Sequence, residues 1–349
     1  MRSSIGLPRR LGRGAAAALG LLLAGLAATP AHVGEVRDKQ WHLDAMRADE
    51  MWKTSTGKGV TVAVIDSGVE ESPMELRGQV LDGKDFAPHK PGDEHTDYDG
   101  HGTGIAALIA GTGAGPGGDG AFGLAPDSKI LPLRVPYDSL GSKFDKPLVE
   151  AIRYAADSNA QIINISVGGA RDIPGADAAV KYALSKGKLI FASSGNEGEH
   201  GSPVNWPAAT PGVVGVAALG RNIETTKEST HGPHVDLSAP GDELVHACAG
   251  GTGLCKSHGT SGAAAIASAS PALIWSKHPT WTNNQVLRVL VETAGKAKSG
   301  KERSDYVGYG AVRPRIALKN PGDPGPAEHI PAAGLPKGQA EVAALFRCR

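Results

Sequence analysis

Short apolar runs alternate with longer amphipathic runs through the central part of the chain, and this alternation restricts the fold more than any other pattern. The runs typical of buried strands are residues 60–66 (VTVAVID), 129–135 (KILPLRV), 161–167 (QIINISV), 188–194 (KLIFASS) and 213–219 (VVGVAAL). Helical patterns lie between several of them, at residues 146–158 and 176–187. The alternation predicts an α/β fold of three layers, a mainly parallel sheet covered by helices on both faces, with function at the carboxyl ends of the strands.

Charge gives no support to a nucleic-acid partner. The 349 residues include 36 Lys plus Arg and 36 Asp plus Glu, and proteins that bind nucleic acid or anionic membranes usually carry a basic excess. We therefore expect no nucleic-acid partner.

The first 31 residues have the pattern of a secretory signal peptide. Four arginines accompany an apolar run at residues 15–28, and Ala31 occupies a small-residue cleavage position. A membrane anchor is the alternative, but a span needs roughly 20 apolar residues and this run is shorter. We expect residues 1–31 to be removed and the mature protein to be secreted or held at the extracellular side of the cell envelope.

Two of the three cysteines are close in sequence. Cys248 and Cys255 precede Ser261, and Cys348 lies one residue from the end of the chain. Export permits disulfides. A zinc site with His246 and His258 is the alternative, but the spacing does not match a zinc pattern. The sequence predicts a Cys248–Cys255 disulfide and gives Cys348 no role.

Two polar residues lie at the boundaries of predicted strands and helices. Asp66 ends the first strand, where active sites of α/β proteins are built, although a turn or capping aspartate has the same local pattern. His101 begins a helical run and could present its ring above the strand ends. Eleven other histidines compete with it, and His258 lies only three residues before Ser261.

Ser261 and Asn196 could supply a nucleophile and an oxyanion donor. Ser261 begins an alanine-rich helical run, where free backbone N–H groups stabilise an anion, but a capping serine fits the same place. Asn196 follows a predicted strand and is either a turn residue or an amide donor. Pro271 should end or kink the helix that Ser261 begins.

Together these motifs resemble the subtilisin-like serine proteases, the subtilases of peptidase family S8. The motifs are VAVIDSGV, DGHGTG, SSGNEG and GTSGA, with further similarity in GLAPDSKILPLRV, VDLSAPG and VGYGAVRPRIAL. The order Asp, His, Ser is the subtilisin order. The preceding segment QWHLDAMRADEMWKTSTGKGV resembles mycosin-like bacterial subtilases, which are associated with type VII secretion.

The resemblance implies a catalytic role for each of the four residues. His101 would accept the Ser261 proton, Asp66 would orient His101, and Asn196 with the Ser261 N–H would bind the oxyanion. The substrate would be a polypeptide in extended conformation, held like an added strand. The implied substrate-binding residues are Ser166, Val167, Gly168, Leu140, Gly141, Ser194 and Gly195.

The domain organisation follows from the composition of the two ends of the chain and from the family resemblance of the residues between them. Residues 1–31 are the expected signal peptide, 32–59 an N-terminal extension, 60–319 the subtilisin-like peptidase domain and 320–349 a flexible tail rich in proline and glycine. Mycosins usually continue into a C-terminal membrane helix, so this chain is either soluble or truncated. We expect a monomer that works with secretion-system components.

Two departures from the family pattern keep an alternative open. Gly262 replaces the usual methionine and Ala265 the usual proline. The leading hypothesis is a secreted endopeptidase, and these two departures favour the alternative, a catalytically weak assembly component of a secretion system.

An esterase of the α/β-hydrolase type would need a glycine where Ala263 stands. The GAGPGG stretch at residues 113–118 does not follow a strand, which argues against a dinucleotide site.

No cofactor or metal site is expected from the sequence. The acidic stretch GDEHTDYDG at residues 92–100 lacks the ligand spacing of an EF-hand. Because calcium often stabilises subtilases, a structural calcium ion is kept as an alternative to this expectation.

Overall fold

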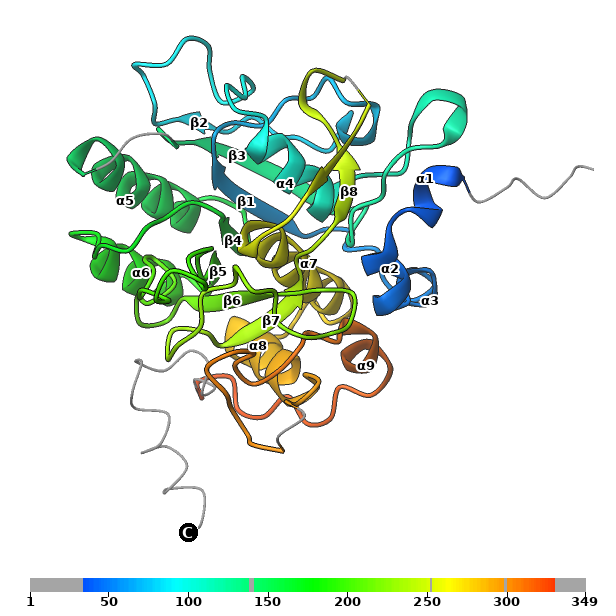
Figure 1. Cartoon of the computed structure of the whole chain (residues 1–349), viewed down its shortest axis with the longest axis vertical. Helices are drawn as coiled ribbons and strands as arrows, with labels where there is room; N and C mark the ends of the chain where they lie inside the picture. The colour runs from blue at the N-terminus through cyan, green and yellow to red at the C-terminus, as the bar shows by residue number, and fades with distance from the viewer. Residues whose placement is uncertain (1–33, 138–140, 252, 298–299, 330–349) are drawn as a thin grey trace, which may run out of the picture. The chain divides into compact units, whose positions relative to one another are not determined.

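The central sheet has seven parallel strands (Figure 1). The computed structural model describes residues 34–329, except 138–140, 252 and 298–299. The strand order is β2 (Lys84–Asp85), β3 (Lys129–Arg134), β1 (Thr61–Asp66), β4 (Ile162–Ile165), β5 (Leu189–Ser193), β6 (Val214–Leu219) and β7 (Leu237–Pro240). All five predicted strands are present. The hydrophobic pattern does not reveal β2, which has two residues, or β7 (LSAP), which lacks a run of apolar residues.

Helices cover both faces of this sheet, as predicted (Figure 1). In β1, Val62 and Val64 join one apolar cluster, which includes α4 (His101–Ala110) and α7 (Thr260–Lys277). Ala63 and Ile65 join the other, with α5 (Ser142–Asp157) and α6 (Ala176–Ser185). Alternate side chains of a strand point to opposite faces, so residues 62–65 of β1 are all apolar because both faces of the strand are covered.

Helix α7 is buried along most of its length and crosses the core. Pro271 does not end this helix, contrary to one of the two expected outcomes, because α7 continues to Lys277. An interior proline costs about 3 kcal/mol. Beyond it Leu273 and Ile274 are fully buried, and burial of each such side chain contributes about 1.5–3 kcal/mol. Tertiary burial therefore maintains the helix across the proline.

The chain before β1 forms three short helices that pack on the body of the protein. They are α1 (Glu35–Asp38), α2 (Trp41–Met46) and α3 (Ala48–Trp52). The Gln40 amide donates to the carbonyls of Phe122 (2.7 Å) and Val245 (3.0 Å) and accepts the Phe122 N–H (3.0 Å). The Trp41 indole donates to the Asp242 carbonyl at 2.8 Å. These contacts fix the segment in place.

A disulfide closes the hairpin that leads to α7. The hairpin comprises β8 (Leu244–Ala247) and β9 (Leu254–Ser257), which pair antiparallel. Cys248 and Cys255 are bonded, with their Cα atoms 5.1 Å apart, as predicted. The remaining helices are α8 (Asn283–Glu292), α9 (Pro314–Lys319) and three 3-10 turns, η1 (Met74–Leu76), η2 (Pro116–Gly118) and η3 (Ala249–Gly251). Within the part of the chain that the structure describes, no helix is both long and apolar enough to cross a membrane.

Candidate active site

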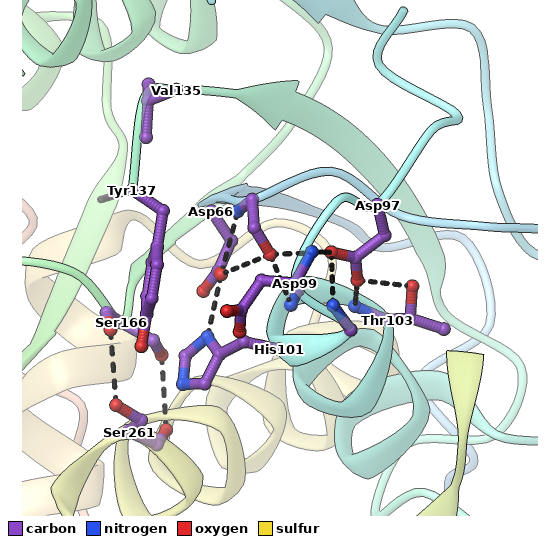
Figure 2. A network of polar contacts seen from close by, with 12 residues as sticks. Asp66, Asp97, Asp99, His101, Thr103, Val135, Tyr137, Ser166 and Ser261 are labelled. Carbon is purple, nitrogen blue, oxygen red and sulfur yellow. Dashed lines mark hydrogen bonds and ion pairs between the residues drawn. The ribbon is translucent and has the colours of Figure 1, made fainter. Parts of the chain in front are cut away.

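Asp66 and His101 meet at the carboxyl end of β1. Asp66 is the last residue of β1 and is fully buried, and His101 is the first residue of α4. The His101 Nδ1 lies 2.7 Å from the Asp66 Oδ1 (Figure 2). A carboxylate at Nδ1 holds the ring proton there and leaves Nε2 as a proton acceptor. This is the arrangement that a general base requires.

The surrounding carboxylates raise the pKa of His101. Burial by itself would lower this pKa, but the charge and hydrogen bond of Asp66, with the charges of Asp99 and Asp97, raise it above 6.5. The imidazolium form is thus stabilised by nearby negative charge. A histidine that gains a proton during a reaction benefits from this stabilisation.

Asp97 ties the end of β1 to the start of α4. Its carboxylate accepts hydrogen bonds from the Ser67 hydroxyl (2.8 Å) and the Gly100 N–H (2.7 Å). Its other oxygen accepts the N–H (2.8 Å) and the hydroxyl (2.6 Å) of Thr103. Because Ser67 adjoins Asp66 and Gly100 adjoins His101, Asp97 fixes both ends of the Asp66–His101 contact (Figure 2).

Glycine permits this close approach of α4 to β1. A Cβ atom on Gly102 would lie 2.1 Å from the Gly68 carbonyl oxygen, a distance that real Cβ contacts do not reach. Any larger residue would move His101 away from Asp66. The residue after His101 is therefore fixed as glycine by packing.

Tyr137 packs against the ring of His101. The two ring centroids are 5.0 Å apart, with the planes tilted by 36°. Burial, followed by the charges of Asp66, Asp99 and Asp97, raises the pKa of Tyr137 to about 12. The phenol is consequently neutral at physiological pH and shields one side of the histidine.

Ser261 lies in the first turn of α7, and His101 extends from α4 toward it (Figure 2). The Ser261 hydroxyl donates to the Ser166 carbonyl at 3.1 Å, and the Ser166 hydroxyl donates to the Ser261 carbonyl at 3.1 Å. Among the residues that the structure describes, no hydrogen bond joins Ser261 to His101. The nucleophile candidate is therefore near the histidine but bonded to Ser166, the residue that follows β4.

The departure at Gly262 has a packing explanation. A Cβ atom there would lie 2.5 Å from the Leu244 Cδ1 of β8. Leu244 is fully buried, so the leucine occupies space that a larger residue at 262 would require. Glycine at this position thus follows from the packing of β8 on α7.

Asn196 is exposed and is oriented by the start of α7. Its Oδ1 accepts both the N–H and the hydroxyl of Thr260, each at 2.9 Å. With Oδ1 engaged in this way, Nδ2 is left as a donor. Ser261 is the second residue of α7, and its N–H has no intrahelical carbonyl partner. Two donors are therefore present beside Ser261.

The predicted substrate-binding residues occupy different environments. Ser166 and Val167 directly follow β4. Gly168 passes so close to the Trp206 carbonyl that a Cβ would lie 2.1 Å from it. Trp206 also exchanges two backbone hydrogen bonds with Gly169, at 2.9 and 2.8 Å. This bridge connects the segment after β4 to the loop after β5.

The remaining predicted residues lie around these segments. Ser194 is fully buried and donates to the Thr230 carbonyl at 3.1 Å. The Gly195 N–H donates to the Thr260 hydroxyl at 3.1 Å. Gly141 precedes α5 with φ of 63°, and Leu140 lies outside the described residues. The roles of these residues remain predictions.

Asp97 and Tyr137 were not predicted from the sequence. Asp97 is one of several acids in residues 92–100, and its number of hydrogen bonds depends on where β1 ends in space. Tyr137 lies three residues beyond the end of β3, so the rule on strand ends could have indicated it. Among the described residues, no group of three His, Cys, Asp or Glu side chains could hold a metal ion.

Comparison with known proteins identifies the family. Residues 57–310 match the model of the subtilase family of S8 peptidases. This chain belongs to the subtilase family. The subtilisin of Bacillus pumilus is 35% identical over 266 residues, covering 76% of this chain and 92% of that protein. The resemblance predicted from the motifs is confirmed, and this subtilase is a serine endopeptidase.

Mycosins are also similar to this subtilase. Mycosin-1 of Mycolicibacterium smegmatis is 33% identical over 334 residues, covering 80% of this chain and 73% of that protein. A solved structure of the serine protease MycP1, described as an essential component of the type VII (ESX-1) secretion system, has a TM-score of 0.70 and 32% identity. The superposition covers 84% of this chain and 91% of that one.

Proposed function

We propose that this subtilase is an exported endopeptidase that uses Asp66, His101 and Ser261 as a triad and passes through an acyl-enzyme. The observation that supports this most directly is the 2.7 Å contact between the His101 Nδ1 and the buried Asp66 carboxylate. That contact provides a base whose protonated form is stabilised by charge.

The reaction begins when the Ser261 side chain rotates from the Ser166 carbonyl toward the Nε2 of His101. The Oγ then bonds to the substrate carbonyl carbon while its proton moves to Nε2. The Asn196 Nδ2 and the Ser261 N–H stabilise the oxyanion. His101 next donates the proton to the leaving amine, and water, deprotonated by His101, hydrolyses the acyl-enzyme.

An extended polypeptide is the proposed substrate. The segment at Ser166, Val167 and Gly168 forms one wall of the binding site, and the Trp206 backbone packs closely against Gly168 and holds this segment in place. The opposite wall would come from Leu140 and Gly141. Main-chain hydrogen bonds to such walls bind extended peptides with little dependence on sequence.

We further propose that the mature protein acts in the cell envelope beside secretion-system components. This rests on the signal-peptide pattern of residues 1–31 and on the similarity to Mycosin-1 and MycP1. The N-terminal residue of the exported protein tests the first part. Mass spectrometry should find a chain that begins at His32, and retention of residues 1–31 would contradict the proposed export route.

A catalytically weak assembly component is the second candidate. The observation in its favour is that the Ser261 hydroxyl donates to Ser166 rather than to His101. If this bond persisted, the serine would not be activated. The two candidates therefore differ in the reactivity of one oxygen atom.

A fluorophosphonate probe distinguishes the two candidates because it labels only activated serines. The signal-cleaved protein should be labelled, and Ser261→Ala and His101→Ala should abolish labelling. His258→Ala is the matched control, because that ring is exposed and pairs with Glu228 at 2.8 Å. Absence of labelling in folded protein would favour the assembly component.

A further inference from the structure

A groove of about 680 Å³ lies beside β2, at the edge of the sheet, and the first turns of α5. None of its residues belongs to the active site described above. Four lysines line it, together with Asp85, Glu150 and several apolar side chains. The lysines are Lys84, Lys90, Lys143 and Lys146.

Positive charge is in excess in this groove. Asp85 is engaged by the buried guanidinium of Arg134 through two contacts of 2.9 Å, and that guanidinium lowers the pKa of Asp85 against the effect of burial. Glu150 lies 3.8 Å from Lys146 in the next turn of α5. Asp85 is therefore paired with Arg134 and Glu150 with Lys146, and the lining has four lysines against two acids.

The lysines of α5 are placed where helix stability does not favour them. Lys143 lies in the first turn of α5, and Lys146 lies just beyond it. The amino end of a helix carries partial positive charge, so acids are stabilising there and cations are not. Both lysines are exposed. An anionic partner would offset this unfavourable placement.

The apolar part of the lining fits a polypeptide better than a free anion. Phe86 and Pro136 are buried beneath the groove, and Pro88 is exposed at its rim. The Lys84 ammonium stands over the rings of Phe86 and Tyr154, 5.3 and 5.2 Å from their centroids. Such contacts hold a lysine while leaving hydrogen-bonding capacity for a ligand.

The groove adjoins the active site. Pro136 lines it, and the next residue, Tyr137, packs on His101 with ring centroids 5.0 Å apart. Lys90 stands 4.8 Å from the ring of Tyr98, whose hydroxyl donates to the Val135 carbonyl. Because Pro136 and Tyr137 are consecutive in the chain, the groove lies beside the residue that packs on His101.

We propose that this groove binds an acidic segment of the polypeptide substrate, a few residues from the bond that is cleaved. The inference rests on the proposed function for the identity of the substrate. It assigns to this subtilase a preference for chains with clustered Asp or Glu beside the cleavage site.

Binding without cleavage is the first test. Fluorescein-labelled peptides with a neutral core, alone or extended at either end by a run of glutamates, are titrated into the Ser261→Ala protein, and anisotropy is recorded. We expect one extended peptide to bind about tenfold more tightly than the neutral one, as a few exposed ion pairs allow. High salt should remove the difference.

Charge-reversal variants test whether the preference for acidic peptides arises from the lysines of the groove. Lys143→Glu with Lys146→Glu should reduce the acidic peptide to the affinity of the neutral one. Lys181→Glu in α6 with Lys186→Glu at its C-cap, both at exposed positions, is the matched control and should retain the preference. Equal affinity for all peptides, equal loss in both double variants, or charge-dependent binding to phosphatidylserine vesicles without peptide preference would overturn the proposal.

Cleavage by the otherwise unchanged protein separates this proposal from the proposed function. The groove variant should lose about tenfold in kcat/KM for the acidic peptide and nothing for the neutral one. If neither peptide nor any other polypeptide is cleaved, the proposed function fails, and the anisotropy titration still decides the groove.

Discussion

At the scale of single residues, the site depends on buried carboxylates placed around one imidazole. Asp66 contacts His101 directly, whereas Asp97 acts through Ser67 and the first turn of α4. The charge of each raises the pKa of His101. Residues that do not touch the substrate therefore set the protonation state of the base.

The pH dependence of peptide hydrolysis should follow His101. A general base must be neutral, and the pKa of His101 is raised above 6.5, so kcat/KM should rise with pH through that raised pKa. Asp66→Asn should move this limb to lower pH and reduce kcat by about 10⁴-fold, because the tautomer is no longer held. A pH–rate profile measures both effects.

Asp99→Asn is the control for that profile. Asp99 raises the same pKa by its charge but is exposed and is not bonded to the ring. This variant should shift the limb in the same direction without the large loss in kcat. An Asp66→Asn protein as active as the parent would rule out the proposed triad.

Asn196 offers a test of the oxyanion donor. Asn196→Asp keeps an oxygen that accepts from Thr260 but removes the Nδ2 donor, so kcat should fall about 10²–10³-fold with little change in melting temperature. Asn196→Ala removes both functions and should also lower the melting temperature. Unchanged kcat in Asn196→Asp would exclude the amide from catalysis.

At the scale of elements, two local structures support the core near the site. The short helices α1 to α3 pack against the loop at Phe122 and against β8. The hairpin of β8 and β9 leads directly to Gly259 and α7, and the Gly259 N–H donates to the Gly241 carbonyl at 2.7 Å. Both elements are short, so they depend on tertiary contacts for stability.

The pH dependence of stability should include a contribution from His42 in α2. This histidine is fully buried, and neither ring nitrogen has a hydrogen-bond partner among the described residues. Burial, with the charges of Arg37 and His246, lowers its pKa to about 3. Its stabilising effect is therefore complete above the ordinary pKa of 6.5 and is lost as pH falls toward 3.

The loss should amount to about 2 kcal/mol at about pH 5. Urea unfolding at neutral and acidic pH measures it, and His42→Leu should remove this part of the pH dependence. His200→Leu, at an exposed ring, is the control. If His42→Leu keeps the full acid sensitivity of the parent, another group is responsible.

Loss of the Cys248–Cys255 disulfide should destabilise the protein by about 2–3 kcal/mol, because the bond closes a short loop in the unfolded chain. Chemical unfolding of the protein with both cysteines changed to serine measures this. If the bond also positions α7, labelling by fluorophosphonate should slow in the same variant. Equal stability of the two proteins would contradict the prediction.

At the scale of the whole molecule, the segment before β1 is part of the folded structure. Leu43 and Met51 are buried in the same apolar cluster as α4 and α7. Removal of residues 32–54 should therefore lower stability by about 3–6 kcal/mol, from two such side chains, as measured by chemical unfolding. Removal of residues 330–349, the part of the predicted tail (320–349) that lies outside the described residues, is the control and should change stability little.

Much of this architecture could be predicted because it depends on local patterns. Apolar runs identified five strands of the sheet. The motifs around Asp66, His101 and Ser261, and the order of these residues in the chain, indicated the family. The strands β2 and β7 were not predicted because β2 has only two residues and β7 contains Ser238 and Pro240 in place of an apolar run. Pro271 does not end α7 as one of the two expectations had it, because burial of the residues beyond the proline outweighs its low intrinsic helix preference.

The sequence by itself determined the layered α/β fold, the subtilase family and the residues available for catalysis, because hydrophobic periodicity and motif order are properties of the chain. Only the tertiary structure decided that Asp97 joins β1 to α4, that Tyr137 packs on His101, that Leu244 requires glycine at 262 and that lysines from β2 and α5 line one groove. These relations join residues distant in the chain, and packing in three dimensions alone brings them within contact distance.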